Sequence, residues 1–263
     1  VKAGTARSMV GSREWTKEED DLLRIIYQDG KVSQEEVCDK LGRSWTSIKA
    51  RSNKIGISRP RKRYTVRSNY FDDVDTPEKA YWLGFITADG SVSDDNRLKI
   101  DLNRKDEEHL KLFRDTIAPD AEVKSSVNRP HMVRFSISDV VLCKGLSRYG
   151  IVPRKTDIIE WPQELSDDLW LPFVAGCFDG DGTYGEYGGK LSIRFLGTRN
   201  LLEGVRERIE DQLGIQMPPV RPSGGSKNLY ALSKTSDGAR KILSMMDSCP
   251  VRLKRKTFAR MCT

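Results

Sequence analysis

An internal repeat constrains this chain more than any other feature of its sequence. The nonapeptide WLGFITADG at 82–90 matches VAGCFDGDG at 174–182 position by position in residue class. Each half also ends in Arg-Lys-Thr, at 154–156 and at 255–257. Two markers that recur in the same order indicate a duplication, so the chain should fold as two similar halves.

The pattern after each nonapeptide predicts the same elements: a strand, a longer strand, a helix, two more strands and a helical region. In the first half these fall near 91–104, 106–117, 121–138 and 139–149, and in the second near 184–197, 199–213, 218–234 and 236–248. With the motif helices, this predicts an α+β fold of two pseudo-symmetric αββαββα units, at 76–160 and 161–263.

Each nonapeptide predicts a helix with small residues four apart on one face, at Gly84, Ala88, Gly176 and Gly180. Packing on these faces would bring the helix C-termini together, and with them Asp89 and Asp181. A carboxylate there faces the negative end of the helix dipole, and two carboxylates repel each other. A divalent cation between them, with oxygen ligands that suit magnesium, would explain the placement. An ordinary Asp-Gly turn after each helix is the alternative.

The N-terminal part has a different pattern, with a flexible start expected at 1–13 and three short helices at 14–57. Capping boxes begin the first two helices at Thr16 and Ser33, and Ser44 begins the third, over 45–55. A tight turn before the third helix is typical of a helix-turn-helix. The predicted core of this small all-α domain consists of Trp15, Leu22, Ile26, Val37, Leu41, Trp45 and Ile48.

The formal net charge of +7 and the pI of about 9.1 favour a polyanionic partner. The stretch 43–71 contains no acid, and a second acid-free run near the C-terminus contains Arg252, Lys254, Arg255, Lys256 and Arg260. A basic linker is expected at 58–75, where Arg61, Lys62 and Arg63 could lie along phosphates. Solvated surfaces are the alternative interpretation of both runs.

Composition also excludes some classes of site. The chain has two histidines and five scattered cysteines without a CxxC pair, which argues against a zinc site. Free cysteines suit a reducing compartment. Neither a signal peptide nor an apolar run of about eighteen residues is seen, so we expect a cytoplasmic protein without a membrane partner.

The paired nonapeptides resemble the motifs of the LAGLIDADG homing endonucleases in their single-chain, two-motif form, over about 76–263. The resemblance implies a monomer whose two antiparallel sheets form a saddle over double-stranded DNA. It also implies magnesium-dependent cleavage across the minor groove that leaves short 3′ overhangs. The implied metal ligands are Asp89 and Asp181, with Mn²⁺ or Ca²⁺ as other possible occupants, and no backbone ligand is assigned. At the sixth motif position Asp179 follows the family, whereas Thr87 departs from it.

The family also places a basic residue near the scissile phosphates, in the segment where this chain repeats Arg-Lys-Thr. Internal symmetry indicates Lys155 and Lys256, whereas comparison with single-motif members indicates Lys254, whose counterpart is Pro153. All three lysines are therefore candidate catalytic residues that could stabilise charge on the phosphate or position water. A solvated basic tail is the alternative.

Alternation in the strands predicts a polar sheet face that suits contact with the major groove. The predicted DNA-contacting residues on this face are Arg97, Lys99, Asp101, Asn103, Arg134, Ser136, Lys190, Ser192, Arg194 and Arg221. The family resemblance places Arg104 and Thr198, at the inner strand ends, near the active site. An ordinary amphipathic sheet is the alternative.

The segment 14–57 resembles Myb/SANT-like helix-turn-helix modules, through WTKEED at 15–20 and WTSIKAR at 45–51. The resemblance implies that the third helix enters a DNA groove. The residues expected to face that groove are Thr46, Ser47, Lys49, Arg51 and Asn53. Because some modules of this class bind proteins, protein docking is the alternative.

Together these features predict a site-specific homing endonuclease that makes a staggered double-strand break in a long DNA target. The N-terminal module would add DNA contacts. Two alternatives remain open. One is a non-cleaving DNA-binding regulator of the same fold, which the two retained acids disfavour. The other is an RNA-binding maturase that assists intron splicing.

Overall fold

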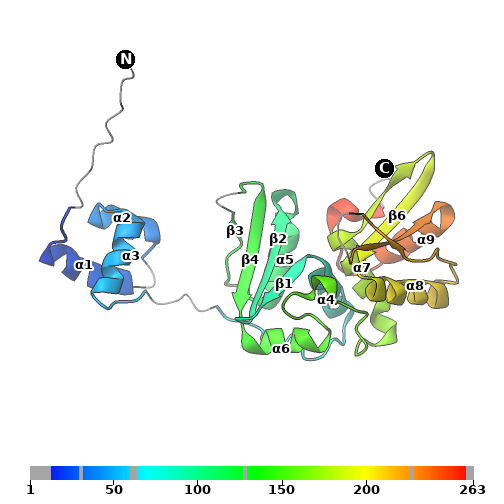
Figure 1. Cartoon of the computed structure of the whole chain (residues 1–263), viewed down its shortest axis with the longest axis horizontal. Helices are drawn as coiled ribbons and strands as arrows, with labels where there is room; N and C mark the ends of the chain where they lie inside the picture. The colour runs from blue at the N-terminus through cyan, green and yellow to red at the C-terminus, as the bar shows by residue number, and fades with distance from the viewer. Residues whose placement is uncertain (1–12, 30–31, 60–63, 127–128, 225–227, 259–263) are drawn as a thin grey trace, which may run out of the picture. The chain divides into compact units, whose positions relative to one another are not determined.

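The computed structural model describes residues 13–29, 32–59, 64–126, 129–224 and 228–258. The chain divides into two compact units, Val1–Arg63 and Tyr64–Thr263 (Figure 1). Each unit has its own apolar core. Within those described stretches, no helix is both long and apolar enough to cross a membrane.

The N-terminal unit contains the helices α1 Lys17–Gln28, α2 Gln34–Leu41 and α3 Trp45–Lys54. Both predicted capping boxes are present, at Thr16 and at Ser33, and Ser44 caps α3 through its hydroxyl. Gly42 ends α2 with a φ of 61°, a left-handed conformation that favours glycine. The caps and the glycine explain why helices this short begin and end where the sequence predicts.

Seven buried side chains form the core of this unit: Leu23, Ile26, Tyr27, Val37, Leu41, Ile48 and Ile57. Trp15 and Trp45 are half-buried against it. Leu22 was predicted to lie in the core, but it is 37% exposed. The buried face of α1 instead follows Leu23, Ile26 and Tyr27, the i, i+3, i+4 spacing of one helix face.

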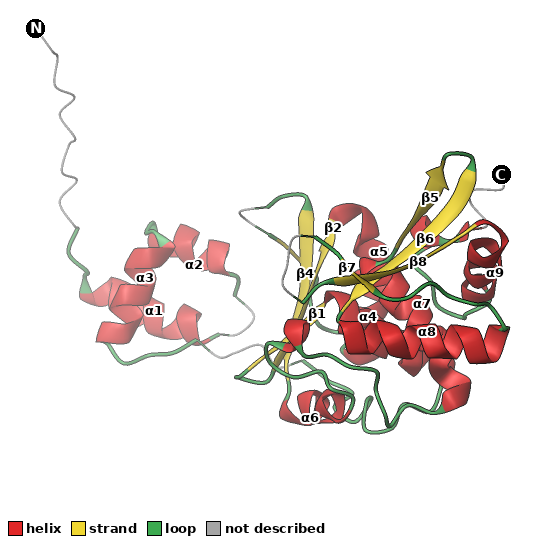
Figure 2. Ribbon diagram, turned by 45° about the vertical axis from the view of Figure 1, so that its right-hand side comes forward, coloured by secondary structure: helices red, strands yellow, loops and turns green. Residues whose placement is uncertain are grey.

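The element order of the second unit confirms the predicted pair of αββαββα halves. The first half consists of α4 Pro77–Asp89, β1 Gly90–Ser93, β2 Arg97–Asn103, α5 Glu107–Ile117, β3 Lys124–Ser125, β4 Met132–Ser138 and α6 Val140–Arg148. The second consists of α7 Trp170–Asp181, β5 Thr183–Tyr187, β6 Lys190–Gly197, α8 Arg199–Leu213, β7 Arg221–Pro222, β8 Tyr230–Thr235 and α9 Ser236–Asp247. The strands form two antiparallel sheets, ordered β1-β2-β4-β3 and β5-β6-β8-β7 (Figure 2).

Each sheet has an apolar face against helices and a polar face away from them. In β2 the side chains of Leu98, Ile100 and Leu102 are buried, and the residues between them are exposed or half-buried. Strands β4 and β6 alternate in the same way. Helices α5 and α6 pack on the first sheet, and α8 and α9 pack on the second. The predicted division into an apolar and a polar face is therefore confirmed.

Helices α4 and α7 pack together through their small residues, between the two sheets (Figure 2). A Cβ atom at Gly84 would lie 2.0 Å from the backbone oxygen of Phe173, and one at Gly176 would lie 2.1 Å from that of Tyr81. A Cβ atom at Gly180 would come within 2.3 Å of a methyl group on α4. No side chain fits at these distances, so this close packing of the two backbones requires glycine.

The segment 64–75 differs from the linker expected at 58–75. Phe71 is fully buried, Val74 lies in the main core, and the Arg67 N–H donates to the carbonyl of Ile117 at 2.9 Å. These apolar side chains fix the segment to the second unit despite its basic composition. Arg61, Lys62 and Arg63 lie outside the described residues.

Candidate active site

The two motif carboxylates lie at adjoining helix ends. Asp89 is the last residue of α4, and Asp181 is the last residue of α7. A Cβ atom at Gly180, the residue before Asp181, would lie 3.5 Å from the Asp89 carboxyl carbon. The glycine packing of the helices thus brings together the two acids that the sequence singled out.

Both carboxylates are electrostatically strained toward their neutral forms. Burial, followed by repulsion from Asp181, raises the pKa of Asp89 to about 6. The pKa of Asp181 is also raised, because protein packed around the carboxylate restricts its hydration. Asp89 is half-buried and Asp181 is more exposed, so the pair reaches the surface at the Asp181 side. Two crowded acids of this kind form a site that gains stability from a bound cation.

Two of the three candidate lysines are buried beside these acids. The amino group of Lys155 donates to the carbonyl of Thr87 in the last turn of α4, at 2.6 Å. The amino group of Lys256 donates to three carbonyls at the end of α7, at 3.1, 2.9 and 2.7 Å, those of Phe178, Gly180 and Gly182. Burial lowers the pKa of Lys155 and lowers that of Lys256 to about 8. Each lysine thus offsets the negative end of its own motif helix.

Lysines of both halves act on each acid. Burial raises the pKa of Asp89 and of Asp181, and the charges of Lys155 and Lys256 oppose that rise at both carboxylates. The arrangement forms one composite centre with two related sides.

Lys254, the third candidate, lies elsewhere. It is exposed at the start of a 3-10 turn, Lys254–Lys256, on the same surface as Glu108 of α5. It lines a surface cavity with Leu112 and Arg255, not the cavity that holds Asp181. The buried positions therefore favour Lys155 and Lys256 over Lys254 as partners of the acids.

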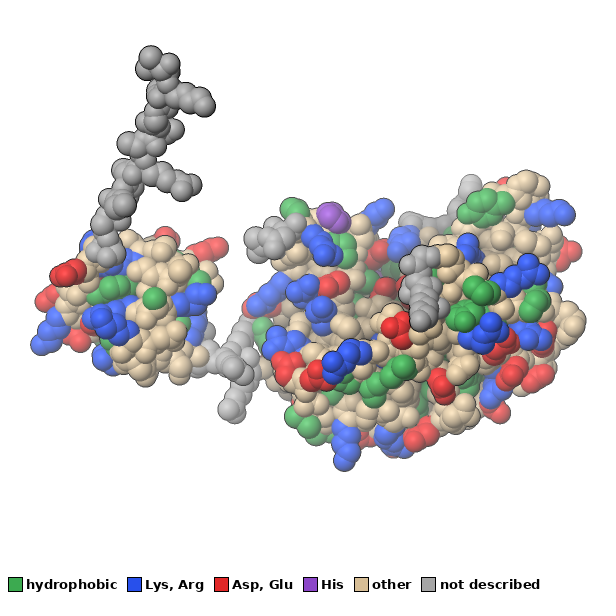
Figure 3. Space-filling view, in the orientation of Figure 1, with side chains coloured by type: hydrophobic (Ala, Val, Ile, Leu, Met, Phe, Trp, Pro, Cys, Tyr) green, Lys and Arg blue, Asp and Glu red, His purple; other side chains and the backbone are tan. Residues whose placement is uncertain are grey.

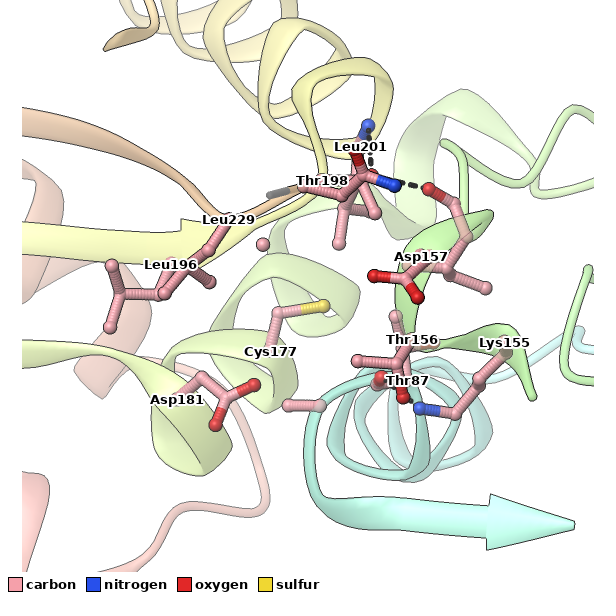
Figure 4. Close-up of a pocket in the computed structure, with 14 residues that line it drawn as sticks. Thr87, Lys155, Thr156, Asp157, Cys177, Asp181, Leu196, Thr198, Leu201 and Leu229 are labelled. Carbon is pink, nitrogen blue, oxygen red and sulfur yellow. Dashed lines mark hydrogen bonds between the residues drawn. The ribbon is translucent and has the colours of Figure 1, made fainter. Parts of the chain in front are cut away.

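A cavity of about 140 Å³ opens beside the acids on the Lys155 side (Figure 4). Figure 4 shows Lys155 reaching the end of α4, Asp181 at the end of α7 and the Cys177 thiol between them and the second sheet. Burial raises the pKa of Cys177, so its thiol stays protonated. The cavity gives solvent a route to the composite centre.

The chemistry of this site fits a magnesium ion. Its donors are two carboxylates, which are the hard oxygen ligands that Mg²⁺ prefers. No group of three or more His, Cys, Asp or Glu side chains that could hold a metal occurs within the described residues. Magnesium commonly binds one or two carboxylates and completes its shell with water and substrate phosphates. Asp89 and Asp181 match that pattern better than that of a closed, all-protein metal site.

The predicted DNA-contacting residues of the first sheet occur on or at the end of its polar face. Asp101 lies opposite Arg134, and their side chains form an ion pair at 2.5 and 2.9 Å. Lys99 lies opposite Ser136, and Arg97 is exposed at the strand end. This face therefore offers both donors and acceptors.

The end of β2 is occupied by local contacts. The Asn103 side chain accepts from a backbone N–H at 3.2 Å in the following turn. Arg104 was expected beside the active site, but its guanidinium donates to Ser125 at 2.8 Å and to the Pro130 carbonyl at 3.0 Å. These contacts bind the Arg104 guanidinium to β3 and to the loop that precedes β4.

The polar face of the second sheet is formed by fewer charged groups. Lys190 and Arg194 are exposed, Ser192 is half-buried between them, and Arg221 is exposed in β7. Thr198 lines the cavity beside Asp181, as expected from its predicted location. The expectation that it contacts DNA is wrong, because Thr198 is buried and its hydroxyl caps α8 and donates to the Ile159 carbonyl.

In the N-terminal unit, Thr46, Lys49 and Asn53 are exposed on α3, and Ser47 is half-buried. Arg51 differs from its predicted role, because its guanidinium is bound to Asp20 of α1, with one contact of 2.7 Å. Arg43 is held in the same way by Glu19, at 3.0 and 2.7 Å. Basic and acidic side chains are also interspersed on the visible face of each unit (Figure 3). A run without acids in the sequence is therefore not free of acids in space.

Sequence reasoning missed a buried polar network around Asp179. Arg252 was predicted to lie in a basic run that faces a polyanion or, as the alternative, solvent, but its side chain is 5% exposed and contacts the Asp179 carboxylate at 3.0 Å. The Tyr81 hydroxyl donates to the same carboxylate at 2.8 Å. A signal was present in the sequence, since Asp179 and Arg252 both differ in kind from their first-half counterparts, Thr87 and Ile151.

Comparison with known proteins gives matches of structure only. No protein-family model matches the sequence, and no curated protein matches it. The structure is similar to the LAGLIDADG homing endonuclease I-LtrWI bound to target DNA, with 12% identity, a TM-score of 0.50, and coverage of 74% of this chain and 88% of that one. I-SmaMI, bound to uncleaved DNA in the presence of calcium ions, gives 12% identity, a TM-score of 0.48, and coverage of 69% and 87%. The N-terminal LAGLIDADG domain of DUF199/WhiA gives 14% identity, a TM-score of 0.45, and coverage of 72% of this chain and 92% of that one.

The similarity to I-LtrWI shows that the chain has the two-unit LAGLIDADG fold. This confirms the fold class predicted from the repeated motifs. The share of this chain that is covered, 74%, is close to the extent of the unit Tyr64–Thr263.

Proposed function

We propose that this protein is a site-specific homing endonuclease that makes a staggered double-strand break in a long DNA target. The observation that carries the proposal is the meeting of Asp89 and Asp181 at adjoining helix ends, with Lys155 and Lys256 buried beside them. Crowded acids at the negative ends of two helices cost stability, and a fold that keeps them has a use for them.

Each group in the centre has a distinct task. A magnesium ion held by Asp89 and Asp181 would supply a Lewis acid for phosphodiester hydrolysis. Lys155 and Lys256 place positive charge where negative charge grows on a phosphate. Because the two halves are pseudo-symmetric and the strands of DNA are antiparallel, each half can serve one strand. The cavity beside Lys155 admits water to the centre on one side.

The polar faces of the two sheets supply the DNA-binding surface. Arg97, Lys99 and Arg134 on one sheet, and Lys190 and Arg194 on the other, provide donors that suit guanine edges or phosphates. The likeness to endonucleases that bind DNA supports double-stranded DNA as the partner. We propose that the protein acts as a monomer, since one chain contains both halves of the centre.

The N-terminal unit would extend this surface as a helix-turn-helix module. Helix α3 presents Thr46, Lys49 and Asn53 to solvent after the tight turn at Gly42. Removal of residues 1–63 should weaken DNA binding by about tenfold and reduce its salt dependence, because phosphate contacts are lost. The cleavage positions should stay the same. An unchanged affinity and footprint would refute this role.

The experiment that tests the proposal is cleavage of a randomised DNA library with magnesium, followed by sequencing of the ends. Asp89→Asn and Asp181→Asn should each reduce cleavage by about 10²–10³-fold, because the cation loses a charged ligand. Binding of the selected target in gel shifts should remain, since neither acid is needed to grip the duplex. These variants keep the volume of the side chain, so the fold is expected to survive.

Other outcomes distinguish the rival functions. Specific binding without cuts, unaffected by either substitution, would indicate a DNA-binding regulator. Absence of specific DNA binding, together with support of intron splicing in a splicing assay, would indicate a maturase. Defined staggered ends that disappear in both variants would establish the nuclease and its shared pair of acids.

A further inference from the structure

Asp179 connects the second motif helix to the C-terminal segment that contains Lys256. The Asp179 side chain is fully buried two residues before Asp181. Its carboxylate accepts the backbone N–H of Leu253 at 2.6 Å and two guanidinium N–H groups of Arg252, both at 3.0 Å. A buried carboxylate with these partners fixes the segment in register with α7.

Arg252 extends the connection to the backbone of Lys256. Its guanidinium donates to the Lys256 carbonyl at 3.3 Å and to the Asp247 carboxylate, at the end of α9, at 2.6 Å. The planar guanidinium therefore joins Asp179, Asp247 and the turn that contains Lys256. A lysine ammonium lacks the planar fork, so it could not repeat the two-pronged contact with the Asp179 carboxylate while also reaching the other two groups.

The first half has uncharged residues at the two corresponding positions. Thr87 stands in place of Asp179, and its hydroxyl donates to a carbonyl one turn earlier in α4 at 2.9 Å. Ile151 stands in place of Arg252 and is fully buried. Lys155 nevertheless reaches the end of α4. The uncharged pair of Thr87 and Ile151 therefore accompanies a placed lysine in the first half, so an ion pair is not the fold's only arrangement at this position.

We propose that Asp179 and Arg252 are positioning residues that hold Lys256 on one side of the composite centre. Apolar packing around Ile151 does the equivalent for Lys155. The inference rests on the proposed endonuclease function for its kinetic consequence, but the placement of Lys256 can be measured without cleavage. One strand of the target should then depend on the ion pair and the other should not.

The test replaces both residues by their first-half counterparts, in the double variant Asp179→Thr/Arg252→Ile. Both charges of the pair are removed together, so neither is left buried alone, and the thermal midpoint of the variant measures the loss of the contacts with Asp247, Leu253 and Tyr81. Cleavage of each strand of the selected target is followed with separate end labels. We expect one strand to be cut at least about tenfold more slowly, the other to be cut at the original rate, and nicked duplex to accumulate. Arg208→Leu, which removes an ion pair to Asp167 elsewhere in the same half, is the control.

A second measurement follows Lys256 directly. Acetylation of lysines by an N-hydroxysuccinimide ester, mapped by mass spectrometry, should be slow at Lys256 in the unmodified protein and faster in the double variant. Labelling of Lys155 should not change. Arg252→Lys keeps a charge beside Asp179 but loses the fork, so it should give a smaller change in the same strand and at the same lysine. This variant also serves if the double variant does not fold.

The outcomes separate this inference from the proposed function. If unmodified protein cuts no DNA, the endonuclease proposal fails, and the labelling still decides whether the ion pair places Lys256. Equal slowing of both strands with a lowered thermal midpoint would overturn the inference, since that indicates a general structural role. Unchanged cleavage and unchanged labelling of Lys256 would overturn it as well.

Discussion

The two halves of the second unit share a backbone plan but support their lysines by different chemistry. In the first half, Lys155 contacts one carbonyl of α4 and lies beside a cavity. In the second half, Lys256 contacts three carbonyls of α7, and a buried ion pair tethers its segment. The difference teaches that the two halves keep the positions of the carboxylates and lysines, while the contacts that support the lysines differ.

The same comparison shows which features the two halves share. A Cβ atom added at Gly84 or at Gly176 would lie at almost the same distance from the facing backbone, 2.0 and 2.1 Å. Asp89 and Asp181 occupy the same helix position. Helix contact and carboxylates are shared by both halves, whereas Thr87 and Ile151 differ from Asp179 and Arg252. We therefore expect symmetric effects from the first group and unequal effects from the second.

The largest effect is expected from the glycines at the contact between the motif helices. Gly84→Val and Gly176→Val should each lower the free energy of unfolding by more than about 3 kcal/mol, or prevent folding, because the facing backbone cannot move aside. Urea denaturation monitored by circular dichroism measures the change. Gly224→Ala is the control, since a Cβ atom there meets nothing within 4 Å. A clear difference in the free energy of unfolding between the two valine variants would show that the two sides of this contact are not equivalent.

The next effect concerns the lysines. Lys155→Met and Lys256→Met should each slow cleavage of one strand by about 10²–10³-fold, and of opposite strands, because each removes positive charge from one side of the centre. Strand-specific end labels on a duplex target measure both rates. Lys254→Met should change neither rate, since Lys254 is exposed beside Glu108. Slowing by Lys254→Met alone would restore the assignment that single-motif relatives suggest.

Sequence alone predicted the symmetric features well, because each depends on local pattern. Alternation defined the faces of β2 and β6, and glycines four apart predicted how α4 and α7 pack. Contacts between distant segments were not predictable in this way. Leu22 was misplaced by one position because several phases fit a short helix. Arg51 was expected to face DNA. Its ion pair with Asp20 could not be predicted, because Asp20 is far from it in sequence.

The candidate site shows the same division between local and distant information. Asp89 and Asp181 were identified from the motifs, but the choice among Lys155, Lys254 and Lys256 depended on which amino groups are buried. Burial of a lysine is decided by tertiary packing, not by the residues next to it. Alignment of the two halves recovers part of that information from the sequence, because Asp179 and Arg252 both differ from their counterparts Thr87 and Ile151.

The smallest effect tests whether the centre is strained when no cation is present. The pKa of Asp89 is raised to about 6, so the folded state binds a proton more tightly than the unfolded chain does. The stabilisation from this tighter proton binding is fully present below the pKa of Asp89 in the unfolded chain, which is about 4. It is lost as the pH rises through about 6. In EDTA, the thermal midpoint should therefore fall by a few degrees between pH 4 and pH 7 from this source.

Asp89→Asn isolates this contribution because it removes the titrating group and keeps the shape. The variant should be more stable than the unmodified protein at pH 7 in EDTA, and the gap should narrow toward pH 4. Added magnesium should stabilise the unmodified protein more than the variant, since the cation relieves the repulsion between Asp89 and Asp181. Asp181→Asn should act in the same direction, because its pKa is also raised. An Asp89→Asn variant that is less stable than the unmodified protein at pH 7 would show that the acid pair is not strained.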